Sequence, residues 1–411
     1  MMSKKSPQLR FEGFTDDWEE RKLGDYSENT FGGGTPKTGI DEYWTGDIPW
    51  IQSSDLKKEQ LYNVQPSKFI TDDAVKNSAT KLVPKNSIAI VTRVGVGKLA
   101  LLPFEYATSQ DFLSLSNLKV DKWFGIYSTY TMLQKELNNI QGTSIKGITK
   151  PELLKKKMRT PSLIDEQSKI GTLFKQLDDI IALHQSKLDL LKEQKKGFLQ
   201  KMFPKNGAKV PELRFAGFAD DWEERKLSDV ANHRGGTAIE KYFDKDGVYK
   251  VISIGSYGLN SQYVDQNIRA ISNEITDGRV VNSGELTMVL NDKTANGTII
   301  GRTLLVEKDN EYVINQRTEI ISPKENFDSN FAYTILNGPF REKVKRIVQG
   351  GTQIYVNYPA VSNLNLELPK IEEQQKIGSF FKQLDDTIAL HQSKLDLLKE
   401  QKKGFLQKMF V

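Results

Sequence analysis

A short glycine-rich segment is the part of the sequence that comes nearest to a known chemical motif. Residues 95–100 read Gly-Val-Gly-Lys-Leu-Ala and follow an apolar, strand-like run, as in the GxGxxA fingerprint of dinucleotide-binding folds. That fingerprint also needs a helix directly afterwards, and Pro103 leaves no room for one. The segment is better explained as a hairpin or loop in which Arg93 and Lys98 could meet a phosphate backbone. A nucleotide-binding enzyme using Gly95–Ala100 stays an alternative hypothesis.

Other catalytic and metal-binding arrangements are missing from the sequence. The chain has no cysteine and only three histidines, His184, His233 and His391, which excludes thiolate chemistry and argues against a histidine-rich metal site. It has no GxxxxGKS/T phosphate loop and no Pro-Pro pair for an Asn-Pro-Pro-aromatic methyltransferase motif. Acid pairs such as Asp178-Asp179 are expected at solvated faces or caps. We therefore expect no catalytic residue, no metal and no cofactor on this chain.

Length and composition indicate a protein of two or three domains. The chain has 411 residues, of which 27% are charged and 38% hydrophobic, and its formal net charge is +5. This composition suits a soluble globular protein and permits nucleic-acid binding without arguing for it. No stretch approaches the ~20 apolar residues of a membrane span, and the charged N-terminus does not resemble a secretory signal. Together with the missing cysteines, this predicts a cytoplasmic protein.

The sequence contains a long duplication interrupted by two different inserts. Residues 175–203 and 382–410 differ at one of 29 positions, and residues 7–23 and 211–227 differ at three of 17. The segments between them, 24–160 and 228–368, have similar lengths but share only short pieces. A duplicated enzyme would keep its chemical residues in both copies. A constant frame around two different inserts instead favours two adaptor domains that each read something different.

The repeated frame ends in a long helix with a continuous heptad seam. Seam positions recur at alternating spacings of four and three, without an intervening proline, which is typical of a coiled coil. About 37 residues of helix would span roughly 55 Å. Two nearly identical helices in one chain can pair around a pseudo-two-fold axis, which predicts an antiparallel pair. The seam residues are Ile170, Phe174, Leu177, Ile181, His184, Leu188, Leu191, Lys195, Phe198 and Met202, and in the second copy Ile377, Phe381, Leu384, Ile388, His391, Leu395, Leu398, Lys402, Phe405 and Met409.

Some residues on and beside the seam suggest further roles. The two seam histidines are expected to fix the register of pairing, and Lys195 and Lys402 to extend outward into solvent. Four leucines lie off the seam and form a candidate partner-docking face. Packing beneath the chain's own inserts is the alternative for them. They are Leu183, Leu190, Leu390 and Leu397.

Both inserts read as mixed domains of many short strands and few helices, so the fold class is α+β. In insert one, strands are expected at 48–51, 87–94, 99–102 and 112–120, and a helix at 127–139. In insert two, strands are expected at 248–254, 285–290, 298–306 and 312–314, and a helix at 331–348.

These features together resemble the specificity (S) subunit of type I restriction–modification systems, over essentially the whole chain. Each half opens on a W-E-x-x-x-L segment, at Trp18 and Trp222, and reaches Gly-Gly-Thr soon afterwards. Each closes on a proline, a Glu-Gln pair and the long helix ending Lys-Lys-Gly-Phe-Leu-Gln-Lys-Met-Phe. Insert one also contains Ile48-Pro49-Trp50-Ile51, whereas insert two has no Ile-Pro-Trp and has Ala238 in place of a proline.

The resemblance implies a non-catalytic DNA reader. Its target recognition domains would be residues 1–160 and 204–368, and its conserved coiled-coil helices residues 161–203 and 369–411. Each domain would read one half of a bipartite site, and the helices would set the unread spacer and dock partners. The implied partners are double-stranded DNA, two methyltransferase (M) subunits and endonuclease/translocase (R) subunits, with S-adenosylmethionine, ATP and Mg on those subunits. A coiled-coil scaffold that does not touch DNA is an alternative hypothesis.

Candidate DNA contacts are basic or amide side chains in the expected loops, because lysine and arginine bind phosphates and arginine, lysine, asparagine and glutamine read base edges. In insert one they are Lys37, Arg93, Lys98, Gln110 and Lys146. In insert two they are Lys293, Arg302, Gln316, Arg317 and Gln353.

Overall fold

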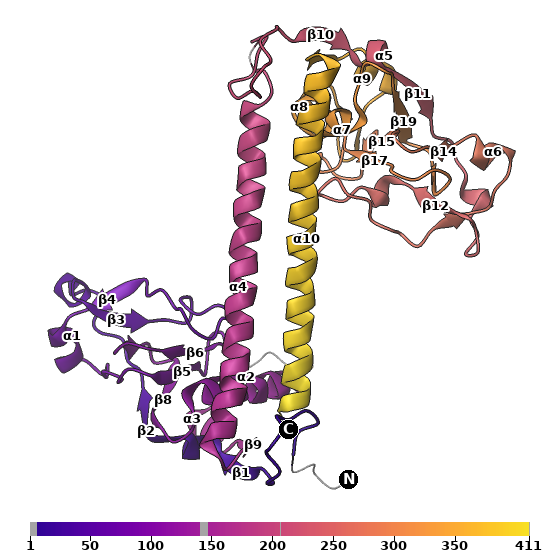
Figure 1. Ribbon diagram of the computed structural model, residues 1–411. Coiled ribbons are helices and arrows are strands. Elements are labelled where there is room, and N and C mark those ends of the chain that lie inside the picture. Colours follow the sequence, from indigo (N-terminus) through magenta and orange to yellow (C-terminus); the bar gives the residue numbers. More distant parts are fainter. Residues whose placement is uncertain (1–5, 140–146, 206, 411) are drawn as a thin grey trace. The chain divides into compact units, whose positions relative to one another are not determined.

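The chain forms two compact units, each built from one insert and parts of both long helices. The computed structural model describes residues 6–139, 147–205 and 207–410. The first unit contains Met1–Gln185 and Ser393–Val411, and the second contains Ser186–Gln392. The long helices are α4 (Ile164–Lys201) and α10 (Ile371–Met409) (Figure 1). Each unit therefore holds the beginning of its own helix and the end of the other.

The two inserts share one sheet topology although their sequences differ. The main antiparallel sheet has the order β2 (Ser27–Gly32), β8 (Phe112–Leu118), β5 (Ser87–Val91), β6 (Leu99–Leu102) in the first unit and β11 (Ala231–Gly235), β19 (Thr318–Pro323), β15 (Leu286–Val289), β17 (Thr303–Leu305) in the second. A smaller sheet beside it contains a parallel pair, β3 (Ile48–Ile51) with β7 (Ala107–Thr108) and β12 (Tyr249–Ile252) with β18 (Tyr312–Ile314). In both copies the frame adds a two-stranded sheet, β1 (Glu19–Lys22) with β9 (Lys157–Thr160) and β10 (Glu223–Lys226) with β22 (Asn365–Leu368). The predicted fold class, two similar mixed domains joined to two long helices, is confirmed.

The remaining elements are short. Those of the first unit are β1 (Glu19–Lys22), η1 (Leu23–Tyr26), β2 (Ser27–Gly32), η2 (Asp41–Trp44), β3 (Ile48–Ile51), β4 (Lys68–Ile70), α1 (Asp72–Lys76), β5 (Ser87–Val91), β6 (Leu99–Leu102), β7 (Ala107–Thr108), β8 (Phe112–Leu118), α2 (Lys122–Asn139), α3 (Lys150–Leu154) and β9 (Lys157–Thr160). Those of the second are β10 (Glu223–Lys226), α5 (Leu227–Val230), β11 (Ala231–Gly235), η3 (Glu240–Tyr242), β12 (Tyr249–Ile252), η4 (Ile254–Ser256), β13 (Arg269–Ala270), α6 (Glu274–Asp277), β14 (Val280–Val281), β15 (Leu286–Val289), β16 (Asn291–Asp292), β17 (Thr303–Leu305), β18 (Tyr312–Ile314), β19 (Thr318–Pro323), α7 (Ser329–Asn337), α8 (Pro339–Arg346), β20 (Gln349–Gly350), β21 (Ile354–Tyr355), α9 (Tyr358–Ser362) and β22 (Asn365–Leu368).

Three of the expected strands have the observed bounds, β3, β6 and β18, and the other five overlap an observed strand. The helix expected at 331–348 is wrong as a single element. The chain breaks it at Gly338 and Pro339, where α7 ends and α8 begins. A proline ring cannot continue the preceding turn but fits the first position of a new helix, so the sequence starts α8 there.

The helix seam is buried or half-buried in both copies, and the helix segments run antiparallel within each unit. In the first unit Phe174 contacts Phe410 (ring centroids 5.5 Å apart), and four residues further along α4 Asp178 pairs with Lys402 (2.5 Å). In the second unit Lys195 pairs with Asp385 at the same distance. The expectation that Lys195 and Lys402 extend into solvent is therefore wrong. Each crosses to the facing helix because a carboxylate there offers a partner.

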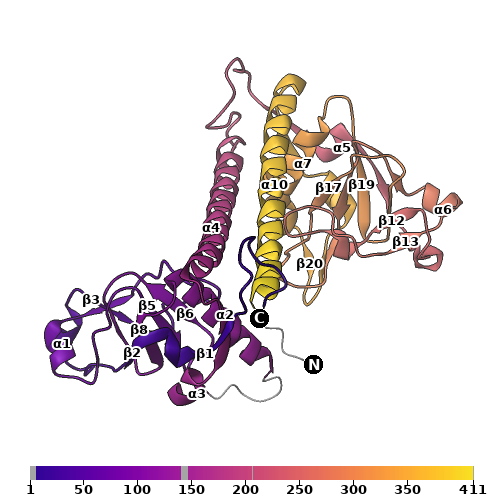
Figure 2. The same cartoon turned by 60° about the horizontal axis from the view of Figure 1, so that its bottom comes forward.

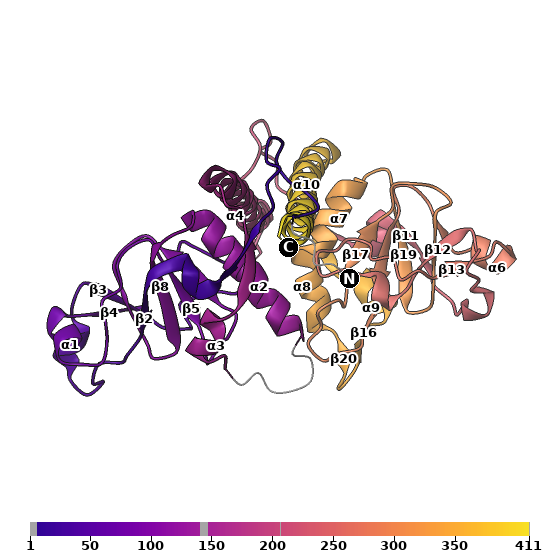
Figure 3. The ribbon, with the colours of Figure 1, turned by 90° about the horizontal axis from the view of Figure 1, so that it is seen from below.

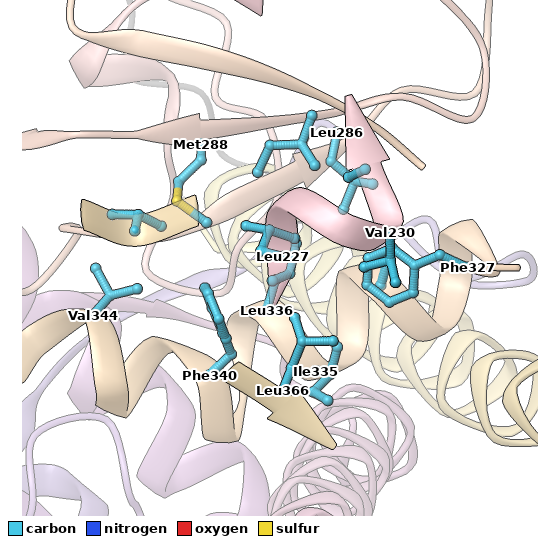
Figure 4. Packing of buried hydrophobic residues seen from close by; sticks show 14 of the residues in the cluster. Leu227, Val230, Leu286, Met288, Phe327, Ile335, Leu336, Phe340, Val344 and Leu366 are labelled. Carbon is cyan, nitrogen blue, oxygen red and sulfur yellow. The ribbon is translucent and has the colours of Figure 1, made fainter. Parts of the chain in front are cut away.

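The core of each unit depends on the end of the other copy's helix. Trp18, Phe124, Phe174 and Phe410 form an aromatic cluster in the first unit. Trp222, Phe331, Phe381 and Phe203 occupy the equivalent places in the second. In the first unit α2 lies beside the main sheet (Figure 2), and its buried side chains belong to the same cluster as those of the sheet. In the second, Leu286 and Met288 of the sheet belong to one buried cluster with Leu336, Phe340 and Val344 of α7 and α8 (Figure 4).

Each long helix contacts the N-terminus of an insert helix through one glutamine and one glycine. The buried Gln167 side chain donates to the Pro161 carbonyl (2.8 Å) and accepts from the Asp121 amide (2.9 Å) just before α2. Gln374 does the same with Pro369 (2.9 Å) and Asp328 (3.1 Å), just before α7. One turn further along, Gly171 and Gly378 lie so close to these helix starts that a Cβ would come within 2.4 and 2.6 Å of a neighbouring atom. The glutamine of the Glu-Gln pair and the helix glycine of the repeated frame are thus explained by this docking, whereas the glutamate of each pair binds an arginine, Arg10 or Arg214.

We expect Gly171→Ala to destabilise the protein although alanine is the better helix former. Its Cβ would lie 2.4 Å from the Phe124 amide nitrogen and 2.6 Å from Trp123 Cβ, and overpacking of this kind costs ~1–3 kcal/mol. Gly197→Ala is the matched control on the same helix, because a Cβ there meets nothing within 4 Å. It should stabilise by ~0.5–1 kcal/mol. Chemical denaturation measures the free energy of unfolding of both variants. Equal changes in the two variants would contradict the close packing of Gly171 against the start of α2.

Candidate nucleic-acid interface

Three segments of insert one meet at one end of its main sheet. They are the β5–β6 loop, the β7–β8 turn and the segment that leads into α3. The Thr92 amide donates to the Asp111 carbonyl (2.7 Å), and the Ile148 amide donates to the Thr92 carbonyl (2.9 Å). This backbone ladder joins the three segments through main-chain hydrogen bonds, and the Thr92 hydroxyl adds a bond to the Asp111 carbonyl (2.8 Å). They can therefore carry variable side chains on a constant support.

Insert two repeats this ladder at equivalent positions. The Leu290 amide donates to the Arg317 carbonyl (3.0 Å), and the Val356 amide donates to the Leu290 carbonyl (2.9 Å). Here the loop after β15 is longer, and β16 pairs with β21 in a small sheet that extends from the domain (Figure 3). Both inserts thus present a turn, a loop and a helix-leading segment together. We take this end of each main sheet as the candidate interface.

The structure brings several of the predicted residues of insert one to this interface. Arg93 lies exposed on the β5–β6 loop, and its guanidinium makes no hydrogen bond to a described residue, although its carbonyl accepts from the Val96 amide (3.1 Å). Gln110 lies exposed on the β7–β8 turn and accepts from the Thr35 hydroxyl (2.9 Å). Lys98 is half-buried because its ammonium donates to the Ser53 carbonyl (2.8 Å). Lys37 is exposed on the loop after β2, outside the ladder, and Lys146 lies outside the described residues.

Insert two places four of its five predicted residues here. Lys293 and Gln353 are exposed, on the β16–β17 loop and the β20–β21 turn. Gln316 and Arg317 form the β18–β19 turn, where Gln316 donates to Glu240 (2.9 Å) and Arg317 is exposed with a left-handed φ of 64°. Arg302 is not grouped with them. Its guanidinium is half-buried and donates to the Thr298 carbonyl and the Ser261 hydroxyl (both 2.9 Å), which indicates a structural role.

Sequence reasoning missed Lys150, which adds to the positive charge of the first interface. Its ammonium lies over Gly32, where a Cβ would approach it to 2.6 Å. Burial, and after it the nearby Arg93 guanidinium, lower the pKa of Lys150. The Asp111 carboxylate opposes that shift. The capping pattern Thr149-Lys150-Pro151-Glu152 indicates a helix start in the sequence. It does not indicate that Lys150 lies near Arg93.

The second interface has different chemistry at the corresponding place. Tyr358, which like Lys150 precedes a proline at a helix start, stacks on His233 (centroids 4.5 Å apart). His233 Nδ1 lies 2.6 Å from a carboxylate oxygen of Glu319. Burial raises the pKa of Glu319, and the hydrogen bond with His233 opposes that shift. The two interfaces thus place different side chains on equivalent backbone.

The structure contradicts a dinucleotide site at Gly95–Ala100. The segment consists of the end of the hairpin loop between the antiparallel strands β5 and β6 and the first two residues of β6, and no helix follows it. Gly95 and Gly97 have φ values of +91° and +95°, so the glycines serve the turn. In the described ranges, no three histidine, aspartate or glutamate residues are grouped as metal ligands would be.

The four leucines off the seam are exposed, not packed under the inserts. Their exposed fractions are 69% for Leu183, 51% for Leu190, 69% for Leu390 and 58% for Leu397. Exposed apolar side chains at equivalent places in both copies suit a protein-docking face. As a separate finding, none of the helices in the described part of the chain is long and apolar enough to span a bilayer.

Comparison with known proteins defines the class to which this chain belongs. A family model described as the type I restriction modification DNA specificity domain matches it twice, over residues 15–193 and 219–400. The specificity subunit of the type I restriction enzyme MjaIX from Methanocaldococcus jannaschii is 25% identical over 96% of this chain and 92% of its own length. The specificity subunit of EcoR124I/EcoR124II from Escherichia coli is 43% identical over 67 residues, 16% of each chain.

Solved structures show the same fold at low sequence identity. The S subunit of a type I restriction–modification system from M. genitalium covers 99% of both chains with a TM-score of 0.66 and 14% identity. A chain from a structure on complex assembly of the type I R-M system covers 95% of this chain and 97% of its own, with a TM-score of 0.51 and 15% identity.

The chain belongs to the type I restriction modification DNA specificity family. Because it carries the specificity domain twice, it is a specificity subunit with two target recognition domains. The predicted family is thereby confirmed, and the enzyme and scaffold alternatives receive no support.

Proposed function

We propose that each recognition domain, residues 1–160 and 204–368, reads one half of a bipartite DNA site through its candidate interface. The observation that carries this is the repeated backbone ladder with different side chains on it, Arg93, Gln110 and Lys150 in one domain and Lys293, Gln316 and Arg317 in the other. Arginine and lysine bind phosphates and guanine, and glutamine can read adenine. Two similar interfaces with unlike residues suit an asymmetric, two-part sequence.

The paired helices, residues 161–203 and 369–411, act in this proposal as spacer and docking element. Their seams are buried or half-buried, while the four leucines remain exposed. The leucines would dock two methyltransferase subunits, and endonuclease/translocase subunits would join that complex. A specificity subunit that lacks catalytic and metal-binding motifs leaves the chemistry to such partners. S-adenosylmethionine, ATP and Mg would therefore bind those subunits.

The purified chain alone should neither methylate nor cut DNA, whereas the chain co-expressed with its methyltransferase should direct adenine methylation to one bipartite motif. Sequencing of methylated adenines in cells with and without the chain measures this. A host strain that carries the methyltransferase without the chain is the control. Methyl transfer by the pure chain, or an unchanged methylation pattern when the chain is removed, would refute the proposal.

A further inference from the structure

The β16–β17 loop of the second unit has exposed side chains on a buried support. Residues Lys293–Asn296 at its tip are exposed, while Gly297 and Ile300 behind them are buried. Within the described residues, the side chains of Lys293 and Asn296 make no hydrogen bond. Lys293 was predicted from the sequence as a DNA contact, whereas Asn296 was not.

Asp292 holds the loop from its N-terminal side. Its side chain is only 3% exposed, and it accepts hydrogen bonds from the Thr294 amide and hydroxyl (both 2.9 Å) and from the Ile299 amide (2.8 Å). Burial opposes its ionisation, but these hydrogen bonds outweigh burial and lower the pKa of Asp292. The carboxylate therefore links both ends of the exposed tip.

Arg341 holds the loop from α8 below it. Its side chain is 7% exposed, with Nε donating to the Ile300 carbonyl (2.9 Å) and Nη2 donating to the carbonyls of Gly297 (3.0 Å) and Thr298 (2.8 Å). No carboxylate of the described chain forms an ion pair with it. Burial, and after it Arg302, lower the pKa of Arg341 to about 10, so it stays charged at neutral pH.

A buried guanidinium bound only to carbonyls is a costly way to stabilise a surface loop. A packed apolar residue could fill the same space without burying a charge, but it would leave three carbonyls without this donor. The rigid planar fork of arginine, however, fixes three carbonyls at once. Binding sites need this kind of support, because a reading side chain must be held in place before DNA arrives.

The loop also belongs to the candidate interface. β16 pairs with β21, and the residue before β16, Leu290, is the central rung of the ladder that includes Arg317. We propose that Asn296 reads a base of the second half-site, with adenine as the base its amide fits best, and that Arg341 is its positioning residue. This inference rests on the proposed function and specifies which loop of the second domain reads sequence.

The test compares variants of the full chain, each co-expressed with its methyltransferase, by mapping methylated adenines. Asn296→Ala should lower the discrimination at one base position of the second half-site by roughly tenfold or more. Arg341→Met should lower discrimination at the positions read by this loop. Arg341→Lys, which keeps the charge and can reach one carbonyl, should fall between Arg341→Met and the wild type. Arg346→Met, the same change at an exposed residue of the same helix, should alter nothing.

The outcomes separate this inference from the proposed function. Suppose that the wild-type chain directs methylation to a bipartite motif and that Asn296→Ala leaves base discrimination unchanged at every position of that motif. The inference about Asn296 is then wrong, and the proposed function is retained. A folded Arg341→Met variant with unchanged preferences would equally overturn the positioning role. If Arg341→Met does not fold, the variants Asn296→Ala and Arg341→Lys test the inference in its place. Loss of discrimination in the first half-site would also count against the inference, because the loop belongs to the second domain.

Discussion

Replacing residues 228–368 with the insert of a relative should change one half of the methylated sequence and leave the other half unchanged. Both inserts are built on the same topology and attach to the frame through the same contacts. The first unit takes no residue from this insert, because it consists of Met1–Gln185 and Ser393–Val411. Its interface, and the half-site we assign to it, should therefore be unaffected. Sequencing of methylated adenines gives both half-sites directly.

The graft must keep the docking contacts to succeed. The new insert has to present a helix start to the Gln374 amide and to Gly378, as Asp328 and Phe331 do. It must also place an aromatic side chain against Phe203 and Trp222. The matched control replaces residues 24–160 in the same way and should change the other half only. Changes in both halves from one graft, or in neither half from a folded chimaera, would refute modular reading.

The helices were the most predictable part of this molecule. The seam from Ile170 to Met202 is periodic, and periodicity depends only on residue type, so burial of Phe174, Leu188 and Met202 follows from the sequence. Lys195 was misplaced for the same reason. A heptad pattern shows that a position faces the partner helix but does not show which side chain stands opposite, and that side chain, Asp385, decides where the ammonium goes.

The candidate interface was less predictable because it depends on contacts between distant segments. Arg93 and Gln110 were found by residue type and loop position. Lys150 was not, since its proximity to Arg93 arises from the ladder at Thr92. Arg341 resembles any charged helix residue in the sequence, and only its burial against three loop carbonyls distinguishes it. The sequence predicted that both inserts are mixed domains, but not that they share one sheet topology. Backbone hydrogen bonds maintain that topology, and they do not require the same side chains in both inserts.

Adding four residues to each long helix should lengthen the unread gap between the half-sites and leave both half-site sequences unchanged. The insertion points are after Gln185 and after Gln392, which are equivalent residues at the boundaries of the two units. Inserted there, the new residues leave the ion pairs Asp178–Lys402 and Lys195–Asp385 within their own units. Four residues extend a helix by about 6 Å. At roughly 3.4 Å per base pair, the expected increase is one or two base pairs.

Four residues are close to one full helical turn, so the added segment rotates the following helix face only modestly. In a coiled coil such an insertion is a stutter, which unwinds the pair locally without breaking it. The control substitutes four residues at the same places without changing the length, and should keep the original gap. Mapping of methylated adenines measures the gap in each strain. An active complex with an unchanged gap would mean that the helices do not set the spacing, and altered half-sites would mean that the helices take part in base reading.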